Sequence, residues 1–160
     1  MEEPNDQNGS DHAEVEFHPP VMLLAALAVG FLLRWIYQLA FLPTTMVIIF
    51  GPAVVIAAFG IFFWAAAAMR KEKTSIQTGT PTDVIVTYGP YSLSRNPIYV
   101  AMLLLLAGVG IWTNSLWFFI VAIVCSRLLD RGVIVPEERY LEREFGSTYS
   151  EYRAKVRRWL

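Results

Sequence analysis

The chain has 160 residues, enough for one domain of ordinary size, and hydrophobic residues make up 55% of it. Only 17% of the residues are charged, whereas a soluble domain carries about 25%. The net charge of -1 conceals two long stretches: Arg34 is the only charged residue between Pro19 and Met69, and none occurs from Asn96 to Ser126. A soluble protein of this size cannot bury both stretches. Composition therefore predicts an integral membrane protein and excludes a disordered chain, a secreted disulfide scaffold and a soluble Rossmann enzyme.

Residues 1–17 hold six acidic residues and no Lys or Arg, which predicts a disordered acidic tail. Residues 18–160 are predicted to form a single all-α membrane domain with four transmembrane helices. These helices are expected over residues 21–41, 46–69, 98–112 and 116–129. A loop rich in Thr, Pro and Gly, residues 70–97, separates the second helix from the third and is expected on the cofactor side.

The last two helices are predicted to form a short hairpin. The apolar run Pro97–Leu129 would extend roughly 50 Å as one helix, which is too long for one upright span. Thr113-Asn114-Ser115 lies in its middle and favours a turn. The alternative is one long, tilted helix.

The basic residues predict the orientation in the membrane. Arg70, Lys71, Lys73 and Arg95 flank the polar loop, and eight Lys or Arg residues follow from Arg127 onward. With four spans these groups share one side, which the positive-inside rule makes cytoplasmic, together with both termini; five spans would split them. The membrane is then a bacterial or archaeal inner membrane, or the endoplasmic reticulum in a eukaryote.

Residues 136–160 predict a pair of helices on the cytoplasmic surface, forming a lid. Pro136 suits the first helical position, and Glu137-Glu138 suits the first turn, where carboxylates face the positive end of the helix dipole. Gly146 can end this helix, and the next is expected to run to about Trp159.

Two groups of residues could carry chemistry. In the segment 89–101, GPYSLSRNPIYVA, Asn96 as N-cap would begin the third helix, and a helix start is a ready anion site. Arg95 adds a full positive charge there, and Tyr91 and Tyr99 add aromatic rings with hydroxyls. The alternative is a capped helix with a snorkelling arginine and two interfacial tyrosines.

The second group is Glu137-Glu138, followed by Phe145-Gly146, Tyr149 and Tyr152. Alone it would be interpreted as a solvated amphipathic helix. Both groups flank the same predicted hairpin, so the chain brings them back to the same membrane face.

GPYSLSRNPIYVA, followed about 40 residues on by EERYLEREFGSTYSEYRAKVRRWL, resembles the isoprenylcysteine carboxyl methyltransferase and phospholipid methyltransferase superfamily. That pattern is Gly-x-Tyr, then Arg-His/Asn-Pro-x-Tyr, a hydrophobic hairpin, Glu-Glu, and Phe-Gly-x-x-Tyr-x-x-Tyr. The resemblance covers roughly half of the chain, from about Asp83 to the end. It implies an integral membrane enzyme that uses S-adenosylmethionine to methylate a lipophilic or small acceptor at the cytoplasmic face.

The resemblance also implies site residues. Cofactor contacts are expected from Asp83, Val84, Ile85, Val86, Tyr91, Asn96, Pro97, Tyr99 and Glu137. Catalytic roles are expected for Arg95, Glu138 and Arg131. Asp83–Val86 would be a strand-like wall of the adenosyl pocket. Three positions depart from the pattern: Asn96 stands where many members have His, Ala101 replaces a Gly, and Arg131 is only the nearest counterpart of the family's substrate arginine.

Elementary chemistry agrees with this reading. Methyl transfer from a sulfonium is an in-line displacement, so the enzyme mainly aligns donor and acceptor. Aromatic walls attract a sulfonium cation, and the helix start at Asn96 would receive the methionyl carboxylate. A carboxylate or thiolate acceptor needs no base, whereas an amine does, and Glu137-Glu138 is the nearby acidic pair.

Other partners and functions are less favoured. The C-terminal charges alternate in sign, which argues against nucleic acid, and His12 and His18 lack metal-ligand spacing. Cys125 is interpreted as a small apolar residue, and Arg34 as either functional or snorkelling. The expected partners are the bilayer and the methyl acceptor, whose identity is left open together with the oligomeric state. The competing class is a non-catalytic membrane scaffold or carrier that retains the fold.

Overall fold

The computed structural model describes residues 18–72 and 84–160. The predicted acidic tail and the middle of the predicted polar loop, which includes Asp83, lie outside the described residues. Every regular element in the described ranges is helical, in agreement with the all-α prediction. In chain order these elements are α1 (Pro19–Ile36), α2 (Thr44–Lys71), the 3-10 turn η1 (Gly89–Ser92), α3 (Pro97–Trp112), α4 (Trp117–Leu129), the π-helical turn η2 (Asp130–Ile134), α5 (Val135–Phe145) and α6 (Ser147–Lys155).

The helices α1 and α2 are long and apolar enough to cross a membrane. Only 17% and 11% of their most apolar windows are buried inside the protein. A core helix of a soluble protein would be mostly buried, so these outward-facing apolar side chains require an apolar solvent. The two helices thus indicate a membrane protein, while membrane crossing by α3 and α4 remains a prediction.

The first helix is shorter than predicted. α1 ends at Ile36 instead of Phe41, and the backbone of Tyr37 is extended. The carbonyl of Tyr37 accepts a hydrogen bond from the indole nitrogen of Trp117 at 2.7 Å. The backbone after Ile36 therefore bonds to residues at the α3–α4 turn and does not continue the helix.

The predicted break between the last two apolar helices is present. α3 ends at Trp112 and α4 begins at Trp117. Between them Asn114 takes a left-handed backbone conformation with φ of 49°, which Asn tolerates better than most residues. The alternative of one long helix is therefore wrong.

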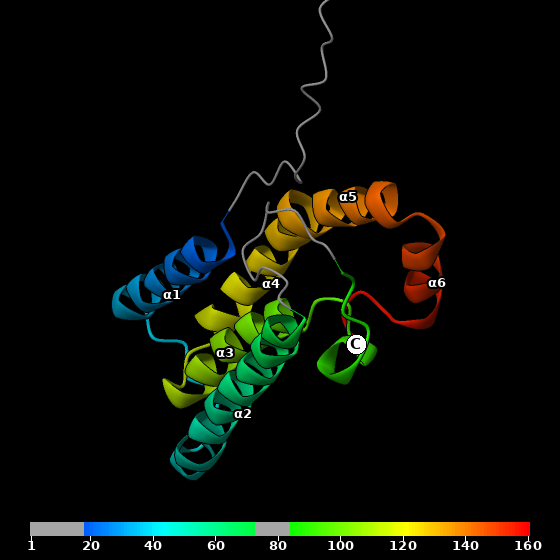
Figure 1. The fold of residues 1–160 in the computed structure, drawn as a ribbon. Coiled ribbons are helices and arrows are strands. Elements are labelled where there is room, and N and C mark those ends of the chain that lie inside the picture. Colours follow the sequence, from blue (N-terminus) through cyan, green and yellow to red (C-terminus); the bar gives the residue numbers. More distant parts are fainter. Residues whose placement is uncertain (1–17, 73–83) are drawn as a thin grey trace, which may run out of the picture.

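The helix α3 lies in the middle of the bundle and contacts α2, α4 and α1. Figure 1 shows α2 and α3 side by side along most of their length. A Cβ atom added to Gly51 would lie 2.5 Å from the Cα of Trp112, and one added to Gly108 would lie 2.9 Å from the backbone nitrogen of Val55. Such close approach of two helix backbones requires small residues at these positions.

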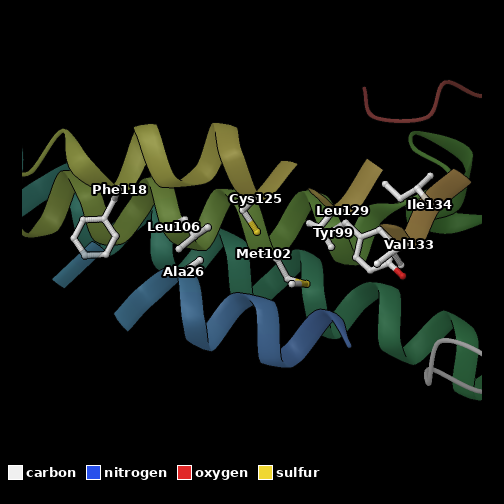
Figure 2. Close-up of a cluster of buried hydrophobic side chains, with 9 residues drawn as sticks. All are labelled: Ala26, Tyr99, Met102, Leu106, Phe118, Cys125, Leu129, Val133 and Ile134. Atoms are coloured by element: carbon white, nitrogen blue, oxygen red, sulfur yellow. The ribbon is translucent and has the colours of Figure 1, made fainter. Parts of the chain in front are cut away.

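The main core fills the space between α1, α3 and α4 and continues into η2 (Figure 2). Its buried members are Ala26, Tyr99, Met102, Leu106, Phe118, Cys125, Leu129, Val133 and Ile134. The core runs from Phe118, beside the α3–α4 turn, to Tyr99 and Ile134 at the opposite end (Figure 2). Cys125 is a buried, small member of it, as the interpretation of its apolar surroundings implied.

Polar groups fasten the end of the bundle at the α3–α4 turn. Arg34 donates a hydrogen bond to the carbonyl of Thr113, at the C-terminus of α3. The side chain of Asn114 accepts from the backbone nitrogens of Phe41 and Leu42, both at 2.9 Å, and donates to the carbonyl of Leu42 at 2.9 Å. Arg34 thus has a structural partner, the negative end of a helix dipole.

At the other end, α4, η2 and α5 form one uninterrupted helical path, which corrects the prediction of a separate helix starting at Pro136. The residues at both junctions, Asp130 and Val135, have ordinary helical backbone angles. Val135 donates its backbone N–H to the carbonyl of Asp130, the longer spacing of a π-helix. Pro136 has no N–H for an α-helical bond to Gly132, so it is compatible with this loosened turn as well as with a helix start.

The last helix also ends earlier than predicted, at Lys155 instead of Trp159. Val156 is extended, and the chain beyond it returns to the segment before α3 (Figure 1). The final residues leave the helix because their backbone groups bond there.

Candidate functional site

The residues of both predicted groups meet at the end of the bundle opposite the α3–α4 turn. Tyr99 comes from the first turn of α3, and Glu137 and Glu138 come from the first turn of α5. The path α4–η2–α5 carries the two glutamates back to the start of α3 because α4 packs antiparallel beside it. The expectation that the hairpin brings the groups together is therefore met for these residues.

Glu137 is in contact with Tyr99. The hydroxyl of Tyr99 donates to the carboxylate of Glu137, with distances of 3.2 and 3.1 Å to its two oxygens. Burial raises the pKa of Glu137 to about 7; the hydrogen bond from Tyr99 lowers it, and the negative charge of Glu138 raises it further. This carboxyl can therefore hold or release a proton near neutral pH.

Glu138 lies between two arginines. Its Oε1 is 2.8 Å from Nη1 of Arg95, and its Oε2 is 2.6 Å from Nη2 of Arg158. Nε of Arg158 donates to Oε1 as well, at 3.0 Å, and Nη1 of the same residue is 3.0 Å from Oδ1 of Asp130. The side chains of Arg95 and Glu138 are each 9% exposed. Both carboxylate oxygens of Glu138 are thus engaged by arginines.

The two tyrosines of α6 attach that helix to the site. Tyr152 donates to the backbone carbonyl of Tyr91 at 2.6 Å, and Tyr149 accepts from Nη1 of Arg95 at 3.1 Å. Burial is the main cause of the raised pKa of each of these tyrosines and of Tyr91. α6 is reached through a turn at Gly146, whose φ is +51°, a conformation that favours glycine.

Asn96 is at the N-cap position of α3, as predicted, but its side chain makes no capping bond. Its Nδ2 donates instead to the carbonyl of Arg158 at 3.0 Å, and Oγ of Ser94 donates to the same carbonyl at 3.2 Å. The backbone nitrogen of Arg95 donates to the carbonyl of Arg157 at 2.9 Å. The end of the chain thus binds the segment before α3, while Pro97 is buried at the first helical position.

The segment before η1 is not strand-like, which corrects that expectation. Val84–Val86 has no regular structure, because no neighbouring strand is present in the described residues to pair with it. Val86 is buried against Tyr91, whereas Val84 is exposed and Ile85 is half-buried. Asp83 lies outside the described residues.

Arg131 is exposed on η2 and takes no part in the ion pairs of the described residues. The structure therefore does not bring it to the other predicted site residues. Asp130, its neighbour, is the residue of η2 that joins the network.

Sequence reasoning missed Arg158, Asp130 and Ser94. Asp130 carried a signal, since it is the first acidic residue after the long stretch without Asp or Glu that follows Asp83. Arg158 was counted only among the basic residues that set the orientation. No local pattern around Arg158 indicated a partner for it.

Comparison with known proteins places this site in a family. The family model for phospholipid methyltransferases matches residues 46–148, more than half of the chain. The chain belongs to the phospholipid methyltransferase family. This confirms the resemblance found in the sequence, and the matched region contains both groups of site residues up to Thr148.

Three relatives share part of the chain. It is 39% identical over 75 residues to the cobalt-zinc-cadmium resistance protein CzcN of Cupriavidus metallidurans, covering 47% of this chain and 34% of that protein. It is 32% identical over 68 residues to the nickel-cobalt-cadmium resistance protein NccN of Alcaligenes xylosoxydans xylosoxydans, covering 42% of this chain and 32% of that protein. An uncharacterized protein of Haemophilus influenzae is matched over its full length, with 35% identity over 63 residues.

The matched regions span only about a third of the two metal-resistance proteins. In residues 18–72 and 84–160 of this chain, no group of three or more His, Cys, Asp or Glu side chains is placed to hold a metal ion.

Proposed function

We propose that the protein is an integral membrane methyltransferase that uses S-adenosylmethionine to methylate a lipophilic or small acceptor at the cytoplasmic membrane face. Membership of the phospholipid methyltransferase family supports methyl transfer in general. The observation that carries the proposal is the convergence of Tyr99 with Glu137 and of Arg95 with Glu138 at one end of the bundle.

The polar groups present fit this cofactor. Nε of Arg95 is buried and has no hydrogen-bond partner among the described residues, and a buried donor left unpaired costs about 1–3 kcal/mol. It is therefore available to an anionic group such as the methionyl carboxylate. Glu137 can accept hydrogen bonds from ribose hydroxyls or the amino group, and the rings of Tyr91 and Tyr99 are attractive to a cation. When bound, S-adenosylmethionine supplies a methyl group on a positively charged sulfur.

The glutamates have different roles in this proposal. Both oxygens of Glu138 are engaged by arginines, so it holds Arg95 in place. Glu137, with a pKa of about 7, is the acidic group that can take a proton from an amine acceptor. A carboxylate or thiolate acceptor would need no such step.

The cytoplasmic assignment rests on the basic end of α2. Arg70 and Lys71 end this helix, which contacts η1. Tyr88, just before η1, donates to Glu72 at 2.9 Å. The site therefore lies at the same end of the bundle as these basic residues, which the positive-inside rule puts in the cytoplasm.

The test is calorimetric titration of the detergent-purified full chain with S-adenosylhomocysteine. We expect saturable binding that weakens about tenfold or more in Glu137→Gln, because the amide keeps the size but loses the charge and one acceptor. Glu142→Gln is the matched control, since this residue is on the same helix and pairs with Arg153 at the surface. Absence of binding to folded protein would favour the non-catalytic scaffold, and equal affinities in the wild type and Glu137→Gln would remove Glu137 from the site.

A further inference from the structure

We infer that Arg158 is a positioning residue that joins the two halves of the candidate site. One half is the segment before α3, with Arg95 and Asn96; the other is the η2–α5 segment, with Glu137 and Glu138. This inference rests on the proposed function for its consequence, the binding of the cofactor. Its structural basis is the set of contacts that a single residue makes with both halves.

The backbone of Arg158 holds the first half. Its carbonyl accepts two hydrogen bonds, from Nδ2 of Asn96 and from Oγ of Ser94. The preceding carbonyl, of Arg157, accepts from the backbone nitrogen of Arg95. Two consecutive carbonyls thus accept hydrogen bonds from three consecutive residues, 94–96. These bonds fix the backbone from which the side chain of Arg95 extends.

The side chain of Arg158 holds the second half. Its guanidinium makes two hydrogen bonds to Glu138, at 3.0 and 2.6 Å, and one to Asp130 at 3.0 Å. Asp130 begins η2 and Glu138 follows it in the first turn of α5, so the guanidinium bridges the π-helical turn. Its pKa is raised, with the hydrogen bond to Glu138 as the main cause.

Bridging this turn fixes Glu137 as well. Glu138 is held between Arg95 and Arg158. Because Glu137 is adjacent to it on the same helix, these ion pairs also fix the direction in which the side chain of Glu137 extends, toward Tyr99. A π-helical turn is less well bonded than α-helix and is a common place for adjustment. Without the guanidinium we expect η2 to relax and both glutamates to shift relative to α3.

An arginine is required for this role. Its planar guanidinium offers five N–H donors in a fixed arrangement and can serve two carboxylates at once. A lysine has the same charge but a single nitrogen, which can approach Glu138 or Asp130 but cannot reproduce the paired contact.

The experiment measures S-adenosylhomocysteine affinity in the full chain for Arg158→Gln, Arg158→Lys and the control Arg157→Gln. Arg157 is exposed, and its substitution leaves both tail carbonyls in place. We expect at least a tenfold loss for Arg158→Gln, a partial rescue by Arg158→Lys and less than a twofold change for the control. Equal affinities for all four proteins would overturn the inference.

A coupling measurement separates positioning from general loss of stability. Asp130→Asn removes one end of the bridge without touching Arg158 or either glutamate, and it is also the milder variant if Arg158→Gln folds poorly. If Arg158 acts through this bridge, Asp130→Asn should weaken binding in the wild type but change it by less than twofold in Arg158→Gln, where Asp130 has already lost its cationic partner. Additive losses would overturn the inference.

Amide hydrogen exchange tests the contacts of Arg158 without any measurement of cofactor binding. In Arg158→Gln the backbone carbonyl remains, so faster exchange at the amide of Arg95 and in α5, with unchanged exchange in α2, would show that the side chain anchors the tail. If the wild type does not bind S-adenosylhomocysteine but this exchange pattern appears, the proposed function fails while the bridge stands. Unchanged exchange would overturn the bridge whatever the cofactor does.

Discussion

Each end of α3 holds an arginine from a part of the chain that has no other charged residue nearby, and the two arginines differ in their partners. Arg34 binds the carbonyl of Thr113 at the C-terminus of α3, where the helix dipole favours a cation. Arg95 lies at the N-terminus of the same helix, where the dipole opposes a cation, and it is ion-paired with the buried Glu138. The contact of Arg34 stabilises the α3–α4 turn. Arg95, in contrast, needs a buried carboxylate, and other polar groups lie around this ion pair.

This contrast teaches how a lone charge in an apolar sequence can be interpreted. A cation near the negative end of a helix finds its partner in the backbone, so it implies no further residues. A cation at the positive end must be balanced by side chains from elsewhere in the chain. For this protein that side chain is Glu138 of the family motif, which also pairs with Arg158, and Arg158 in turn pairs with Asp130.

The largest expected effect comes from breaking the buried ion pair. Arg95→Ala removes one of the two arginine partners of Glu138 and the donor to Tyr149, so we expect S-adenosylhomocysteine affinity to fall by more than tenfold. Arg153→Ala, at a surface pair with Glu142, should change it by less than twofold, since such pairs contribute little. Titration calorimetry of both variants decides this, and equal effects would remove Arg95 from the cofactor site.

A smaller effect is expected from the proton on Glu137. Its pKa is raised from 4.5 to about 7 in the folded protein, so the folded state keeps a proton that the unfolded chain has lost. The associated stability, up to about 3 kcal/mol, is present below pH 4.5 and is lost as the pH rises through 7. Thermal midpoints in detergent should therefore fall with pH more steeply in the wild type than in Glu137→Gln. Parallel curves for the two proteins would contradict the raised pKa.

The smallest effect on binding is expected at the opposite end of α3. Arg34→Leu removes the hydrogen bond to Thr113, so we expect a lower thermal midpoint, by a loss of about 1–3 kcal/mol for an unpaired carbonyl. The affinity for S-adenosylhomocysteine should change by less than twofold. A tenfold loss of affinity at normal stability would show that the two ends of α3 are not separate in function.

Much of the fold could be predicted from the sequence because it follows from local composition. The apolar runs gave the helices, and the Thr113-Asn114-Ser115 segment gave the turn between α3 and α4. The continuous junction of α4 and α5 could not be predicted, since Pro136 is compatible both with a helix start and with a π-helical turn.

The candidate site was predictable only in outline. The motif indicated that Arg95 and the two glutamates would meet, but not which glutamate pairs with which partner. Tyr99 contacts Glu137 and Arg95 pairs with Glu138, and these partners are seen only in the folded chain. The contacts of Arg158 with residues near position 95 and position 130 depend on the path of the whole chain, and no local pattern encodes them.

The four charged side chains of the cluster that includes Arg158 have a consequence for charge balance. The cations of Arg95 and Arg158 are neutralised by the anions of Glu138 and Asp130. Among the described residues of the site, Glu137 is then the acidic side chain without an arginine partner, and it is the natural counter-charge for a cationic guest. Binding of a cation beside it would favour its ionised form and release a proton, and conversion of that guest to a neutral product would allow the proton to return.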